Sequence, residues 1–188
     1  MKKRLVLAID GHDGAGKTTL ARALASSLGG TIVHPFSGSI GADLLRAGNQ
    51  GDVEGLINIG SAAISKALSY APTSVPIVLD RGWMTVASFI PHSSVFFAQW
   101  KAWIPTTLCW ADLETTLMRL ASRQNEKTEP TAWHQHYLSV YMDLARWSDS
   151  PILRTDRLDL GVCISKLVVW AKAGPAAPCP PNPQNSHL

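Results

Sequence analysis

Four residues near the N-terminus, Gly11, Gly16, Lys17 and Thr18, follow the pattern G-x-x-x-x-G-K-[ST] of a phosphate-binding loop. Glycines let the backbone turn so that successive N–H groups converge on phosphate oxygens, while the lysine reaches the β and γ phosphates and the hydroxyl holds Mg²⁺. The pattern predicts binding of ATP and Mg²⁺, against the alternative of a plain glycine turn. The predicted binding residues are Gly11, His12, Asp13, Gly14, Ala15, Gly16, Lys17, Thr18 and Thr19.

A second pair of candidate residues, Asp80 and Arg81, follows the apolar run PIVL. Ligands of open α/β sheets bind beyond the carboxyl ends of the strands, so this pair is well placed to act. Asp80 is a candidate general base for an acceptor hydroxyl. Orienting Mg²⁺ together with Thr18, or holding Arg81, is an equal alternative for Asp80.

Short β-rich runs alternate with segments of helical period, which predicts an α/β fold. We expect the three-layer sandwich of P-loop NTPases, with a five-stranded parallel sheet and helices on both faces. The expected strands are 4–9, 31–34, 76–80, 106–111 and 151–155. The expected helices follow the loop up to Gly29, run from about Val53 to Ala71, begin after Asp112, carry Trp133 to Leu144, and carry Leu160 to Ala171.

The length of 188 residues, 46% of them hydrophobic, suits one folded domain, which we expect at 1–172. The proline-rich residues 173–188 are expected to form a disordered tail.

The three cysteines lack metal-ligand spacing, and we expect them to be free. The apolar run after the basic N-terminus is too short for a signal peptide or a membrane span, so we expect a cytoplasmic protein without membrane contact. The net charge of +3 fits an anionic substrate.

The phosphate loop is shared by GTPases, motors and small-molecule kinases, and the chain has no guanine-reading N-K-x-D. It resembles the thymidylate kinase family of P-loop nucleotide kinases in four stretches. These are GHDGAGKTT, the pair Asp80-Arg81, LMRLASRQ, and EPTAWHQHYLSVYMDLA. The resemblance implies that Asp13 faces the acceptor's sugar, Arg81 faces phosphates, and Arg119 or Arg123, on a lid of about 119–130, faces the transferring γ-phosphoryl group. The resulting catalytic set is Lys17, Asp80, Arg81, Arg119 and Arg123.

The chain departs from this family where the acceptor's 5′-phosphate would be clamped. His34 stands where the family has an arginine, and Lys66 is the one charged residue in NIGSAAISKA. An unpaired phosphate dianion beside the donor triphosphate is strongly disfavoured, so the acceptor is expected to be a hydroxyl, or a nucleotide whose phosphate lies outside the pocket. A phage branch of this family phosphorylates the hydroxymethyl group of 5-hydroxymethyluracil in DNA, and the departures favour that thymine-like acceptor.

Tryptophans near the predicted site offer surfaces on which an extruded DNA base could stack. Core packing is the expected role of any single tryptophan, and the candidates for stacking are Trp83, Trp100 and Trp103.

Two other functions remain open at this stage. One is a kinase for free thymidylate or another pyrimidine deoxynucleoside monophosphate, with Lys66 or His34 replacing the missing arginines. The other is a nucleotide-binding module without catalysis. The oligomeric state is open, a homodimer included, and a phage-encoded chain would work in the host cytoplasm.

Overall fold

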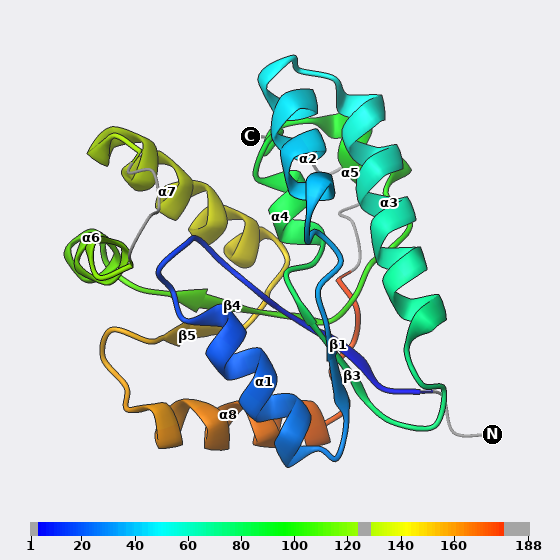
Figure 1. Cartoon of the computed structure of the whole chain (residues 1–188), viewed down its shortest axis with the longest axis vertical. Coiled ribbons are helices and arrows are strands. Elements are labelled where there is room, and N and C mark those ends of the chain that lie inside the picture. The colour runs from blue at the N-terminus through cyan, green and yellow to red at the C-terminus, as the bar shows by residue number, and fades with distance from the viewer. Residues whose placement is uncertain (1–3, 124–128, 179–188) are drawn as a thin grey trace.

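The structure, a computed structural model, describes residues 4–123 and 129–178. A five-stranded sheet forms its centre, with the order β2-β3-β1-β4-β5 and every neighbouring pair parallel (Figure 1). The strands are β1 (Val6–Asp10), β2 (Thr31–Val33), β3 (Ile77–Asp80), β4 (Thr106–Trp110) and β5 (Ile152–Arg154). The central strands are short apolar runs, as expected for a sheet that is covered on both faces. The predicted α/β fold with a five-stranded parallel sheet is confirmed.

Helices cover both faces of this sheet (Figure 1). On one face, α1 (Lys17–Ser27) and α8 (Leu160–Lys172) pack on Leu7, Ile9 and Val78. On the other face, α3 (Val53–Tyr70), α4 (Trp83–Ala87) and α7 (Thr131–Trp147) pack on Ala8 and Leu79. Because side chains alternate along a strand, neighbouring residues of β1 enter different cores.

Two further helices, α2 (Ser39–Asn49) and α5 (Ser94–Gln99), and the short α4 were not predicted. The α2 segment contains two glycines, which disfavour a helix locally. It is helical because it packs along α3, and Gly48 lies so close to Phe89 that an added Cβ would come within 2.7 Å of that ring. Tertiary packing therefore overrides the local preference.

The helix α6 (Leu113–Ala121) begins where it was expected. The Asp112 carboxylate accepts a 2.9 Å hydrogen bond from the Thr115 N–H, which caps the first turn. The predicted lid continues beyond this helix, and its residues 124–128 lie outside the described residues.

Two tryptophans that were considered as stacking surfaces lie inside the core. Trp83 is fully buried and Trp100 is 1% exposed. The Trp83 ring meets Trp103 at 5.1 Å and Trp147 at 6.0 Å between ring centroids. Stacking of an extruded base on Trp83 or Trp100 is therefore wrong for this structure, because both rings fill the space between α3, α4, α5 and α7.

Cys109 and Cys163 are buried and free, as expected, while Cys179 and the rest of the predicted tail at 179–188 lie outside the described residues. Helix α8 ends at Lys172, and residues 173–178 form neither helix nor strand. Within the described ranges, no helix combines the length and the apolar character that crossing a membrane requires.

Candidate active site

The phosphate loop connects β1 to α1 in a conformation that needs glycine. Gly11 has φ 137° and Gly16 has φ 82°, both in the region that favours residues without a Cβ. A Cβ on Gly11 would lie 2.2 Å from the carbonyl oxygen of Cys109, so the loop touches the backbone of β4. The helix that follows begins at Lys17 and points its N-terminus, with its unpaired N–H groups, at the loop.

Lys17 lies within this loop and is 6% exposed. Its Nζ donates a 2.7 Å hydrogen bond to the His12 carbonyl oxygen and is 3.6 Å from Asp13 Oδ1. Burial and the positive charge of Arg81 lower the pKa of Lys17 to about 8, while Asp13 opposes this shift. The ammonium group is thus held where the motif requires a cation for phosphate.

Thr18 and Asp80 meet at the edge of the loop and fit a magnesium site. The Thr18 hydroxyl donates a 2.6 Å hydrogen bond to Asp80 Oδ2, and His34 Nδ1 lies 3.2 Å from the same oxygen. Asp80 Oδ1 is buried and has no hydrogen-bond partner among the described residues, so one carboxylate oxygen is left for a cation. Mg²⁺ in phosphotransferases takes one or two carboxylates and otherwise binds water and substrate phosphates. Consistently, the described residues contain no cluster of three His, Cys, Asp or Glu that could hold a metal by itself.

Arg119 lies behind the phosphate loop. Its guanidinium donates a 3.1 Å hydrogen bond to the Gly14 carbonyl oxygen, and two more to the side chain and the backbone of Thr155, at 3.0 and 2.7 Å. The Thr155 hydroxyl in turn donates to the Ala15 carbonyl oxygen at 3.0 Å. Arg119 and Thr155 therefore fix the backbone of the loop. Thr155 belongs to no recognisable motif, so this contact could not be predicted from the sequence.

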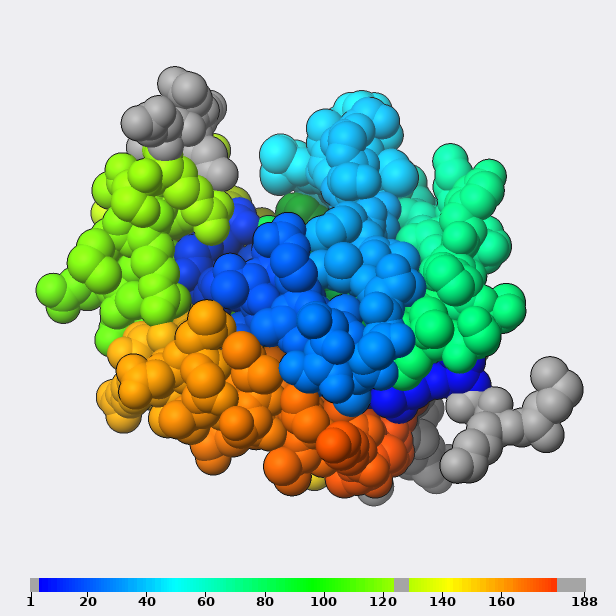
Figure 2. Space-filling model, turned by 60° about the horizontal axis from the view of Figure 1, so that its bottom comes forward, coloured from blue at the N-terminus to red at the C-terminus, as the bar shows by residue number. Residues whose placement is uncertain are grey.

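A cavity of about 490 Å³ opens beside the loop, at the carboxyl end of the sheet. Figure 2 shows the molecule hollowed between α6 and α2, and residues from both helices line the cavity. Among the described residues, five aromatic side chains form much of its wall: Phe36, Phe89, Trp133, Tyr137 and Tyr141. A volume of this size with an apolar wall and a few polar groups is typical of a site for a small molecule. Trp133 and Tyr137 of α7 thus belong to the cavity wall.

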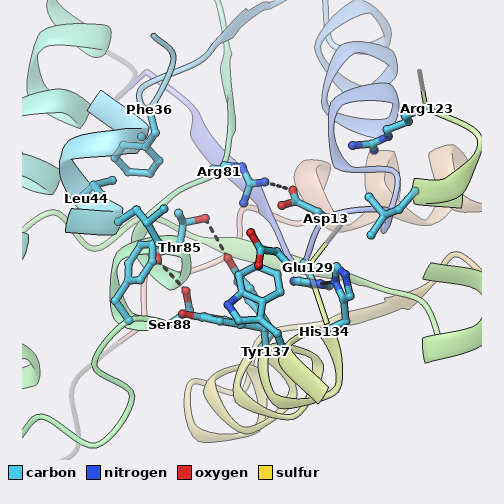
Figure 3. Close-up of a pocket in the computed structure, with 17 residues that line it drawn as sticks. Asp13, Phe36, Leu44, Arg81, Thr85, Ser88, Arg123, Glu129, His134 and Tyr137 are labelled. Atoms are coloured by element: carbon cyan, nitrogen blue, oxygen red, sulfur yellow. Dashed lines mark hydrogen bonds and ion pairs between the residues drawn. The ribbon is translucent and has the colours of Figure 1, made fainter. Parts of the chain in front are cut away.

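Among the described residues, the charged side chains that line the cavity are two arginines and two carboxylates, namely Arg81, Arg123, Asp13 and Glu129. Arg81 pairs with Asp13 across the edge of the loop (Figure 3). Burial raises the pKa of Asp13, but the charges of Arg81 and Lys17 outweigh this effect and hold the pKa well below its usual range. Arg123 lines the cavity and Arg119 does not, so the two arginines of the predicted lid helix have different surroundings.

The position of Arg81 depends on Asp10, which the sequence did not single out. Asp10 is fully buried and accepts hydrogen bonds from the Gly82 N–H at 2.8 Å and from the Thr85 hydroxyl at 2.6 Å. Arg81 has φ 79°, an unusual value for a residue other than glycine. Hydrogen bonds hold this turn on both sides, because the Arg81 N–H also donates to the Ile9 carbonyl oxygen at 2.9 Å. The segment after β3 is thereby fixed against the phosphate loop.

The remaining predicted residues divide between the site and the surface. Thr19 is exposed on α1, next to Thr18, and Lys66 is exposed on α3 and does not line the cavity. His12, in the loop, is buried and forms a 2.9 Å hydrogen bond with His134 of α7. The sequence pattern gave no sign of this contact between residues 122 positions apart.

Several solved structures are similar to this chain. A deoxyadenosine kinase from M. mycoides with bound dCTP matches with a TM-score of 0.61 and 17% identity, over 90% of this chain and 100% of that one. The chain has the fold of this kinase. Shikimate kinase from Acinetobacter baumannii in complex with shikimate gives 0.54 and 18%, over 92% and 93% of the two chains. The YorR protein from Bacillus subtilis, in complex with phosphorylated GDP, gives 0.61 and 15%, over 89% and 95%.

No model of a known protein family matches the chain, and no curated protein sequence does. Identities of 15 to 18% show a common fold and leave the substrate to be argued from the site.

Proposed function

We propose that the protein is a kinase that uses ATP and Mg²⁺ to phosphorylate a hydroxyl group on a thymine-like acceptor, which binds in the cavity beside the phosphate loop. The observation that carries this proposal is the pairing of Arg81 with Asp13. It joins the loop to the cavity wall, and the described lining residues of that cavity carry two positive and two negative charges.

On the donor side, Lys17, the loop N–H groups and the N-terminus of α1 bind the phosphates of ATP. Thr18 and Asp80 hold Mg²⁺, which neutralises charge on the β and γ phosphates when bound. The contact between Asp80 and Thr18, and the absence of Asp80 from the cavity lining, favour this role for Asp80 over that of general base. Arg119 is a positioning residue because it acts through the loop backbone.

On the acceptor side, the carboxylate of Asp13 belongs to the phosphate loop and also lines the cavity. It orients the acceptor hydroxyl, whose oxygen attacks the γ-phosphorus while the bond to the β–γ bridging oxygen breaks and ADP leaves. The hydroxyl proton passes to the Asp13 carboxylate and then to solvent. Because the hydroxyl proton is lost late in a loose transition state, the main role of Asp13 is to orient the hydroxyl, since its lowered pKa makes it a weak base. Arg81 and Arg123 stabilise charge on the transferred group.

The charge of the cavity favours a neutral acceptor over a monophosphate. Lys66, an alternative ligand for an acceptor phosphate, does not line the cavity. A phosphate dianion would meet the two carboxylates of the lining and the triphosphate of the donor. A nucleoside is the first class to test, because one of the similar structures is a deoxyadenosine kinase.

The sequence favours the hydroxymethyl group of 5-hydroxymethyluracil in DNA as acceptor. This group has the chemistry of the proposed acceptor, namely a neutral hydroxyl on a thymine-like ring. Burial of Trp83 and Trp100 removes the stacking argument that supported an extruded base, so we place the free nucleoside first. Free thymidylate is the third acceptor to compare.

Steady-state kinetics with these three acceptors tests the proposal. We expect kcat/KM for thymidine, or for DNA that contains 5-hydroxymethyluracil, to exceed the value for thymidylate. Higher efficiency with DNA and a steep fall with salt would identify the DNA base as acceptor. Phosphorylation of thymidylate alone would contradict the neutral acceptor, and ATP binding without transfer to any acceptor would indicate a non-catalytic module.

A further inference from the structure

His134 carries an unpaired polar atom in the wall of the cavity. The side chain is 3% exposed and lines the cavity together with Tyr137, which lies one turn further along α7 (Figure 3). Its Nδ1 is bound to His12 Nε2 at 2.9 Å. Its Nε2 is buried and has no hydrogen-bond partner among the described residues.

A buried nitrogen without a partner destabilises the folded protein by about 1–3 kcal/mol, so such a group usually has a function or a ligand. Packing does not require an imidazole here, because a phenyl ring would fill a similar volume. The unpaired atom belongs to a wall residue of α7 that also forms a hydrogen bond with the phosphate loop.

The contact with His12 orients His134 and links the hydrogen-bonding roles of its two ring nitrogens. A hydrogen bond between two ring nitrogens needs one N–H and one lone pair. If His12 donates, His134 Nε2 carries the other proton and is a donor. If His134 Nδ1 donates, Nε2 is an acceptor. Burial, together with Lys17, His134 and Arg81, lowers the pKa of His12 to about 4 against the effect of Asp13, so His12 is neutral at pH 7.

We propose that His134 Nε2 forms a hydrogen bond with the polar edge of the acceptor's ring and thereby selects the acceptor, while His12 holds the imidazole in place. This inference rests on the proposed function and specifies its substrate. The cavity wall offers aromatic rings against which a planar ring can pack, among them Phe89 and Tyr137, which meet edge to face at 6.4 Å between centroids. The matching class is a heteroaromatic ring with a carbonyl oxygen or a ring N–H on its edge, as in a pyrimidine base. An aliphatic hydroxy acid offers no such edge.

The test compares His134→Phe and His134→Gln with His136→Phe, a matched control because His136 is exposed on the same helix. With thymidine as acceptor, His134→Phe should raise the acceptor KM about tenfold with a smaller change in kcat, as expected for the loss of one buried hydrogen bond. His134→Gln should recover part of the loss, because its amide both donates and accepts. The control should behave as wild type.

Thermal unfolding and ATP binding show whether each variant is folded. An unchanged acceptor KM in folded His134→Phe, beside an active wild type, overturns the role of His134 and leaves the kinase proposal intact. It would mean that Nε2 binds only water. A wild type that phosphorylates neither a nucleoside nor DNA containing 5-hydroxymethyluracil overturns both proposals.

Discussion

The Thr18 hydroxyl donates a 2.6 Å hydrogen bond to Asp80 Oδ2, which joins the first helical turn after the phosphate loop to the end of β3. The two residues are 62 positions apart, and the second oxygen of Asp80 is buried without a partner. Together they form the oxygen-rich corner to which we assign Mg²⁺.

Asp80→Asn should therefore increase the Mg²⁺ concentration needed for half-maximal activity. We expect a rise of about tenfold or more, since an amide oxygen replaces a charged ligand; tenfold corresponds to about 1.4 kcal/mol. Thr18→Ser keeps the hydroxyl and should change this concentration little. The measurement is a Mg²⁺ titration at fixed ATP, with the exposed Asp143→Asn as control. An Asp80→Asn protein with the wild-type Mg²⁺ dependence would rule out the magnesium role.

His12 should make the protein less stable in mild acid. Burial is the main cause that lowers its pKa in the folded state from 6.5 to about 4. Between these values the unfolded chain binds a proton that the folded protein does not, so stability falls as pH drops from 6.5 towards 4, by up to about 3 kcal/mol. Urea unfolding across this range should show a smaller pH slope in His12→Gln than in wild type. The exposed His136→Gln is the control, and an identical slope in all three proteins would refute the assignment.

Thr85 and Thr107 are both buried, yet their replacement by valine should have different effects. The Thr85 hydroxyl donates to the buried carboxylate of Asp10 at 2.6 Å, whereas Thr107 Oγ1 has no partner among the described residues. Thr85→Val should lower the free energy of unfolding by about 1.5–3 kcal/mol, because hydrogen bonds to charged groups are the stronger ones. Thr107→Val should be neutral or stabilising. Denaturant unfolding measures both, and an equal loss in the two variants would contradict the role given to Asp10.

Local sequence was enough for the parts of the fold that repeat a simple pattern. The apolar strands and the long amphipathic helices α3, α7 and α8 have clear periods, and Asp112 was a recognisable cap. The helices α4 and α5 have five and six residues, too few to show a helical period. Helix α2 depends on contacts with α3 that no local pattern displays.

The residues of the candidate site likewise divide into those that a local motif identifies and those that only the folded chain brings together. A motif identified the phosphate loop, because its glycines and Lys17 are close in sequence. Arg119 and Arg123 were both expected on a lid that faces the γ-phosphoryl group. In the structure α6 ends at Ala121, and of these two arginines Arg123 lines the cavity while Arg119 does not. Contacts such as Arg119 with Thr155 and His12 with His134 join distant segments, so they appear only in the folded structure.

The most direct test of the central claim is the transfer of label from γ-labelled ATP to an acceptor, with wild type and Lys17→Ala compared side by side. Thymidine, thymidylate and DNA with and without 5-hydroxymethyluracil are offered in separate reactions with Mg²⁺. The account predicts label on a hydroxyl of a thymine-like acceptor, and a loss of about 10²- to 10³-fold in kcat for Lys17→Ala, as for other groups that stabilise transition-state charge. The exposed Lys66→Ala should retain activity. Label released only as inorganic phosphate, or full activity in Lys17→Ala, would contradict the account.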